Sequence, residues 1–78
     1  IKKKMKVEIQ TGHYYFKVLI DDLPHVVIDR KKFVGFQGWV DDDGIFVIEY
    51  YTTKNKIRTE QDTKDKWVQI LSELNKCL

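Results

Sequence analysis

The side chains of this sequence that could carry chemistry are few and scattered. His13 and His25 are its only histidines, and each lies beside a turn. A histidine close to Asp21, Asp22 or Asp29 has the groups needed for general-base catalysis or metal binding. However, neither histidine is followed by a second at i+4, and no cysteine is near either one. We therefore interpret both as solvent-exposed turn residues.

The run Asp41-Asp42-Asp43-Gly44, followed by Glu49, has the composition of a calcium loop. Calcium loops of the EF-hand type alternate their oxygen ligands along the chain and end on a glutamate of the same loop. Here the aspartates are consecutive, so their side chains cannot all converge on one ion, and Glu49 lies in a strand-like segment. Because Asp-Gly accepts the positive φ of tight hairpin turns, the sequence predicts a solvated hairpin at this run and no metal site.

No nucleophile or phosphate-binding loop is apparent. Cys77 has no base placed to activate it, and Ser72 lacks the glycine-flanked turn of serine hydrolases. Gly35 and Gly38 are not followed by a helix, as a phosphate-binding loop requires. We therefore predict no catalytic residue, no cofactor and no enzymatic activity.

The segment that organises the chain is its C-terminal stretch. Asp62 or Thr63 is a suitable helix N-cap, and Asp65 adds negative charge near the positive end of the helix dipole. Apolar side chains then follow at the spacing of one helical face, at Trp67, Ile70, Leu71, Leu74 and Leu78. The pattern predicts an amphipathic helix over residues 63–78.

The rest of the chain has the pattern of strands. Alternating or β-branched segments separated by turn residues are predicted at residues 5–10, 14–21, 25–29, 33–40, 45–52 and 57–61. Gly35 and Gly38 lie inside one of these segments and indicate a bulge or a sharp bend. We expect an α+β fold, a bent antiparallel sheet of five or six strands packed against one C-terminal helix. Its predicted core is Val7, Ile9, Phe16, Val18, Ile20, Val26, Ile28, Phe46, Ile48, Tyr50, Trp67, Ile70, Leu71 and Leu74.

Size and composition set the class of protein. At 78 residues, 42% hydrophobic and 33% charged, the chain fits one small globular domain over residues 1–78. It has one cysteine and no apolar run long enough to cross a membrane, so we expect a cytoplasmic location. Two interpretations stay open: residues 1–4 are an appended or disordered stretch before a natural start at Met5, or the whole chain is cut from something longer.

A single helix cannot cover both faces of the predicted sheet. The face opposite the core would carry Tyr15, Leu19, Val27, Val47 and Tyr51, and Trp39 would lie on one face or the other. Such an apolar patch is larger than a monomer usually exposes. Two resolutions stay open: the sheet curls on itself, bent at the two glycines, or a partner covers the outer face.

From this excess of apolar surface we predict a non-catalytic binding module that acts through protein–protein interaction, homodimerisation included. Aromatic residues are enriched at protein interfaces, and open sheet edges can accept a strand. The predicted partner-binding residues are the larger side chains of the outer face, Tyr15, Leu19, Trp39 and Tyr51.

The alternative is binding of single-stranded nucleic acid. Basic residues interleaved with aromatic residues on a sheet can follow a phosphate backbone while bases stack. The candidates are Lys17, Arg30, Lys31, Lys32, Lys54, Lys56 and Arg58, with a further cluster at residues 2–4. Against this, the many aspartates of the turns reduce the positive field, since the formal net charge is only +2.

Overall fold

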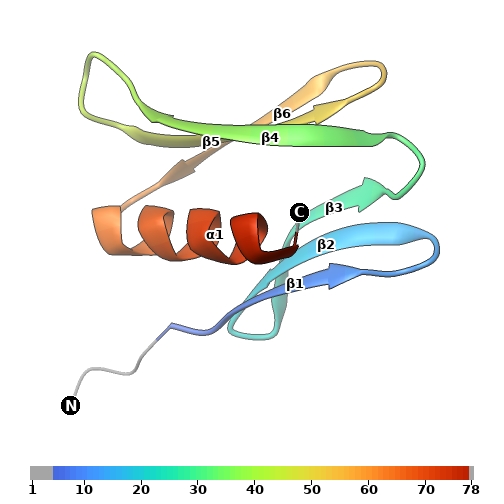
Figure 1. Cartoon of the computed structure of the whole chain (residues 1–78). Helices are drawn as coiled ribbons and strands as arrows, with labels where there is room; N and C mark the ends of the chain where they lie inside the picture. Colours follow the sequence, from blue (N-terminus) through green and yellow to red (C-terminus); the bar gives the residue numbers. More distant parts are fainter. Residues whose placement is uncertain (1–4, 78) are drawn as a thin grey trace.

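The computed structural model of the chain describes residues 5–77, and these form six strands followed by one helix (Figure 1). The elements are β1 (Val7–Thr11), β2 (Tyr15–Ile20), β3 (Leu23–Asp29), β4 (Phe33–Val40), β5 (Phe46–Thr52), β6 (Lys56–Gln61) and α1 (Lys64–Cys77).

The strands of residues 5–77 form two antiparallel sheets, ordered β1-β2-β3 and β4-β5-β6, with α1 packed beside both (Figure 1). This confirms the predicted α+β fold with a C-terminal helix, but the sheet is divided where we expected one bent sheet. The break falls at residues 30–32, where the Asp29 carboxylate accepts from the backbone N–H of Lys31 at 3.0 Å. It does not fall at the glycines: Gly35 lies at a bulge in β4, and Gly38 faces α1.

The tight turns are built by aspartates. Asp21 and Asp22 have φ of 51° and 67°, which aspartate tolerates better than most residues, so two residues suffice to reverse the chain. β3 therefore starts at Leu23, earlier than predicted, and includes Pro24 on an edge strand, where a missing N–H is tolerated. The predicted Asp41–Gly44 hairpin is confirmed. One Asp41 carboxylate oxygen accepts from the N–H groups of Asp43 and Ile45, both at 2.9 Å.

The helix α1 begins after its cap. Thr63 Oγ1 accepts from the backbone N–H of Lys66 at 3.2 Å, so Thr63 is the N-cap that the sequence offered as one of two. The predicted last residue, Leu78, lies outside the described residues. Two side chains fix the two flanks of α1. Trp67 Nε1 donates to the carbonyl of Val47 at 3.0 Å, and Gln69 Nε2 donates to that of Met5 at 2.7 Å.

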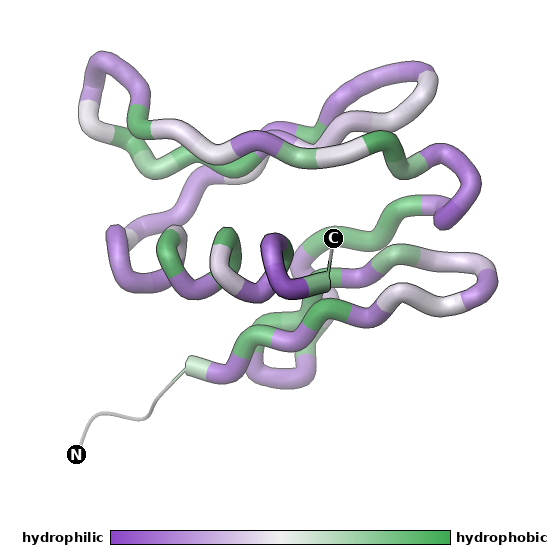
Figure 2. The backbone as a smooth tube through the Cα atoms, in the orientation of Figure 1, coloured by the Kyte–Doolittle hydropathy of each residue, from purple (hydrophilic) through white to green (hydrophobic). Residues whose placement is uncertain are grey.

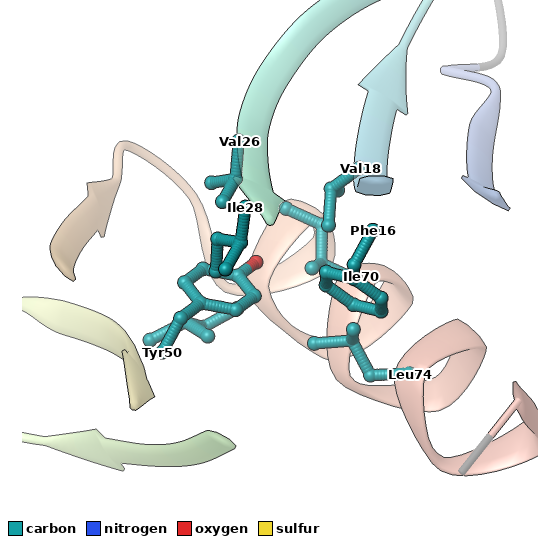
Figure 3. Close-up of a cluster of buried hydrophobic side chains, with 8 residues drawn as sticks. Phe16, Val18, Val26, Ile28, Tyr50, Ile70 and Leu74 are labelled. Atoms are coloured by element: carbon teal, nitrogen blue, oxygen red, sulfur yellow. The ribbon is translucent and has the colours of Figure 1, made fainter. Parts of the chain in front are cut away.

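The core lies between the two sheets and α1 (Figure 3). Its buried members are Phe16, Val18, Val26, Ile28, Ile48, Tyr50, Ile70 and Leu74, all of them predicted. Phe33, which was not predicted, joins the sheets by stacking on Phe16 with ring centroids 4.1 Å apart. Phe46 is half-buried outside this cluster and contacts Trp67 instead. Figure 2 shows apolar residues gathered in the strands and helix, with hydrophilic connections at the ends.

Tyr50 carries a hydroxyl into this core. The side chain is fully buried, and its oxygen has no hydrogen-bond partner among residues 5–77. Burial disfavours the phenolate and raises the pKa of Tyr50 well above its ordinary value. The hydroxyl therefore costs stability, since an unpaired buried polar group loses its hydration without replacement.

Tyr50→Phe is accordingly expected to raise the free energy of unfolding by about 1 kcal/mol, because it removes that hydroxyl and keeps the ring. Urea unfolding monitored by tryptophan fluorescence measures the change. Tyr51→Phe is the matched control, since the Tyr51 hydroxyl donates to Gln37 Oε1 at 3.1 Å and its loss should give no gain. A Tyr50→Phe protein less stable than wild type would show that the hydroxyl has a partner.

Candidate interaction surfaces

The four residues predicted to bind a partner lie on two different faces. Tyr15 and Leu19 alternate with buried Phe16 and Val18, so they lie on the outer face of the β1-β2-β3 sheet. Trp39 pairs with Val47, and Tyr51 pairs with Gly35 and Lys56, on the outer face of the other sheet. Because the inner faces of both sheets meet in the core, the outer faces point away from each other. The structure therefore does not bring these four side chains into one surface.

The surplus of apolar surface is smaller than the sequence suggests. Tyr15 and Val27 are 52% and 46% exposed, but Val47, expected on the exposed face, is fully buried. Its cross-strand neighbours are Trp39 and Glu60, and it lies outside the main core cluster. Long side chains on adjacent strands cover a small residue between them with their aliphatic parts. The sequence pattern could not show this covering.

Polar side chains occupy the outer face of the β4-β5-β6 sheet. Glu49 is 6% exposed, and its carboxylate lies 3.8 Å from Lys56 Nζ. Arg58 contacts Asp41 at 3.4 Å and Glu60 at 3.1 Å. Desolvation and the nearby charge of Glu49 raise the pKa of Tyr51, whose hydroxyl donates to Gln37 Oε1 at 3.1 Å. Lys56 and Arg58, two of the predicted nucleic-acid ligands, are therefore already paired with carboxylates.

The other predicted basic residues lie elsewhere. Lys17 lies on the outer face of the β1-β2-β3 sheet, with Nζ 5.7 Å from the centre of the Tyr15 ring. Arg30, Lys31 and Lys32 form the connection between the sheets, and Lys54 lies in the β5–β6 turn. Within residues 5–77 none of these five cations has a carboxylate within ion-pairing distance. The basic cluster at residues 2–4 lies outside the described part of the chain.

The edge of β4 is a feature that the sequence analysis missed. β4 ends its sheet, and its eight residues, FVGFQGWV, include no charge and no proline. Each other edge strand that the structure describes carries such a residue: Glu8 in β1, Pro24 in β3 and Lys56 in β6. Charges and prolines are the usual protection of a sheet edge against pairing with another strand. An uncharged run of this length was the signal in the sequence.

An open hollow lies on the flank of α1 that faces β4. About 520 Å³ in volume, it is lined by Trp67, Val68, Leu71, Ser72, Asn75 and Lys76. Leu71 reaches β4 at Gly38, where an added Cβ would lie 2.6 Å from Leu71 Cδ1. Val68 and, on β4, Val34 and Val40 are 48%, 65% and 48% exposed. The residues that line the hollow all belong to α1, and Leu71, which reaches Gly38, connects the hollow to β4.

Most side chains considered from the sequence for catalysis or metal binding lie apart, but His13 and Asp29 line the same hollow. Among residues 5–77 no three His, Cys, Asp or Glu side chains gather as a metal site would require. His13 lies in the β1–β2 turn, edge-on to Tyr14, and His25 lies in β3. Partial burial and the nearby Lys66 charge lower the pKa of His25. Cys77 is exposed in the last turn of α1.

Comparison with known proteins gives one weak relationship. No family model matches the chain, and no solved structure matches it significantly. A seed linoleate 9S-lipoxygenase-2 from Pisum sativum is 27% identical over 73 residues, which cover 94% of this chain but 8% of the lipoxygenase. Identity this low over so small a part of that enzyme assigns no family. No helix of residues 5–77 is long and apolar enough to span a membrane.

Proposed function

We propose that this domain is a protein-interaction module that binds an extended segment of another protein along the edge of β4. The observation that carries the proposal is the uncharged, proline-free edge of β4 among edge strands that are otherwise protected. An extended peptide adds a strand to such an edge through main-chain hydrogen bonds, which give affinity without demanding a particular sequence.

The hollow beside β4 supplies specificity. Side chains of an added strand project alternately to its two faces. Those on the inner side would approach the α1 flank at Val68 and Leu71, and those on the outer side would pass near Trp39. The module therefore favours an apolar residue at alternate positions of its ligand, because most of the surface that the hollow presents is apolar.

Two of the sequence-predicted partner residues remain in this proposal. Both lie on the outer face of the sheet that contains β4: Trp39 on β4 itself, beside the bound segment, and Tyr51 on β5, across Gly35 from it. Tyr15 and Leu19 belong to the other sheet and take no part.

Selection from a random library of displayed peptides of about eight residues tests the proposal, since a random library does not require the partner to be identified first. We expect wild-type protein to enrich peptides with alternating apolar residues. Val34→Lys/Val40→Lys places two charges beside the β4 edge at exposed positions, so it should weaken binding of those peptides about tenfold or more without unfolding the domain.

Val27→Lys is the matched control, because Val27 is comparably exposed but lies on the opposite outer face. It should leave peptide affinity unchanged. Peptides bound equally by all three proteins, or no enrichment at all, would refute the proposal. Sedimentation equilibrium of the three proteins completes the test: a wild-type dimer lost only in the β4 variant would identify a second copy of the chain as the segment's source.

A further inference from the structure

The connections of this fold separate charge by sign. In Figure 1 the β1–β2, β3–β4 and β5–β6 connections lie together on the right, the β4–β5 and β6–α1 connections lie on the left, and the β2–β3 turn lies below α1. The β1–β2, β3–β4 and β5–β6 connections at one end contain Arg30, Lys31, Lys32 and Lys54 and no acidic residue. The other three connections, β2–β3, β4–β5 and β6–α1, contain Asp21, Asp22, Asp41, Asp42, Asp43 and Asp62 and no cation. The small net charge therefore conceals a basic end, formed by the first three connections, and an acidic end at the β4–β5 and β6–α1 connections, where Arg58 and Lys66 pair with Asp41 and Asp62.

Backbone hydrogen bonds hold the basic end together. The N–H of Arg30 donates to the carbonyl of Tyr14 at 2.9 Å, which joins the β1–β2 and β3–β4 connections. The N–H of Thr53 donates to the carbonyl of Lys32 at 2.9 Å, which adds the β5–β6 turn and with it Lys54. Three segments far apart in the sequence thus form one surface with a fixed arrangement of cations.

Aromatic side chains accompany these cations. Tyr14 is 76% exposed and Tyr15 is 52% exposed, so neither side chain is part of the buried core. Both rings line a hollow of about 200 Å³ with His13, Asp29 and Lys31. The hollow is small for a drug-sized molecule, and its size and aromatic lining suit a single planar group. Asp29, whose Oδ1 accepts from the N–H of Lys31, adds a hydrogen-bond acceptor at its wall.

We propose that the basic end binds single-stranded nucleic acid, with phosphates beside Arg30, Lys31, Lys32 and Lys54 and an unstacked base on Tyr14 at the hollow. Cations that follow a backbone, next to aromatic rings that stack bases, are what sequence-tolerant single-strand binding requires. A duplex keeps its bases stacked inside and cannot offer one to Tyr14. Asp29 is the one aspartate beside these cations, whereas the aspartates of the β2–β3, β4–β5 and β6–α1 connections lie away from them, so four cations face a single carboxylate here.

This site is separate from the β4 edge, so either proposal can fail without the other. Fluorescence anisotropy with a labelled oligothymidylate of about twelve nucleotides, and with its duplex, measures the binding. We expect preference for the single strand and an affinity that falls with salt, with a log–log slope of about −2 to −3, as release of counterions from three or four phosphates predicts.

Two pairs of variants locate the site. Lys31→Glu/Lys32→Glu should lower the affinity about tenfold or more. The control is Lys64→Glu/Lys76→Glu, which changes the net charge by the same amount at exposed positions of α1 and should lower the affinity far less. Tyr14→Ala should lower affinity about fivefold or more with an unchanged salt slope, because stacking releases no counterions. Tyr51→Ala, on the other sheet, should have no effect.

Three results would overturn the proposal. The first is absence of binding at low salt. The second is an equal loss in the two charge-reversal variants, which would indicate attraction to net charge alone. The third is wild-type affinity in Tyr14→Ala together with equal binding of duplex, which would indicate a general polyanion surface. Concentration-dependent self-association that Lys31→Glu/Lys32→Glu abolishes, without oligonucleotide binding, would assign the basic end to the acidic end of a second copy instead.

Discussion

Leu74→Ala is expected to lower the free energy of unfolding by about 2–5 kcal/mol, the usual cost of removing a buried leucine side chain and leaving a cavity. Leu74 is fully buried against core side chains of both sheets, and the surrounding strands are fixed by their hydrogen bonds, so the cavity cannot collapse fully. A domain of this size has few such side chains, and the loss is a large part of its total stability.

Leu71→Ala is the matched control on the same helix. Leu71 is only half-buried, at the border of the hollow, so the same change in side chain should cost distinctly less. Urea unfolding of the two variants measures the difference. Equal losses, or a larger loss in Leu71→Ala, would show that the buried face of α1 is assigned wrongly.

Gly38→Val is expected to lower the free energy of unfolding by about 1–3 kcal/mol, the usual cost of inserting methyl groups into a packed contact. An added Cβ at Gly38 would lie 2.6 Å from Leu71 Cδ1, 2.7 Å from Cδ2 and 3.2 Å from Cγ. The first two contacts are closer than carbon atoms pack and the third is tight, so α1 must move away from β4 or Leu71 must change rotamer.

Gly35→Val separates this clash from the general effect of replacing glycine in a strand. An added Cβ at Gly35 meets no atom within 4 Å, so this variant should match or exceed wild-type stability. The double variant Gly38→Val/Leu71→Ala should recover part of the loss, because it removes the side chain that collides. Equal stability of the Gly35 and Gly38 single variants would contradict close packing of α1 on β4.

Local pattern predicts most of this fold. The alternation in residues 14–21, the Asp-Gly hairpin and the apolar face of α1 each indicate one element, because each depends on neighbours in the sequence. The local pattern does not show how the elements pack against one another. Division into two sheets depends on the turn at residues 30–32, and burial of Val47 on an outer face depends on side chains from two adjacent strands.

The candidate sites show the same limit more strongly. Sequence reasoning placed Tyr15 and Trp39 on one surface because both are apolar and outward, but only the tertiary arrangement shows that their faces point apart. The basic end is likewise invisible along the chain, where aspartates and lysines alternate from turn to turn. The uncharged run in β4 was visible, yet its meaning depends on β4 being an edge.

Amide hydrogen exchange along β4, with and without a library-selected peptide, tests the central proposal most directly. Strand addition at the β4 edge predicts that slowed exchange appears at alternate amides of residues 33–40, those whose N–H groups point away from β5, and is absent from β1, β3 and β6 edge amides. Protection that appears at β1, β3 or β6, or only in α1 with the β4 amides unchanged, would contradict the proposal that β4 is the binding edge.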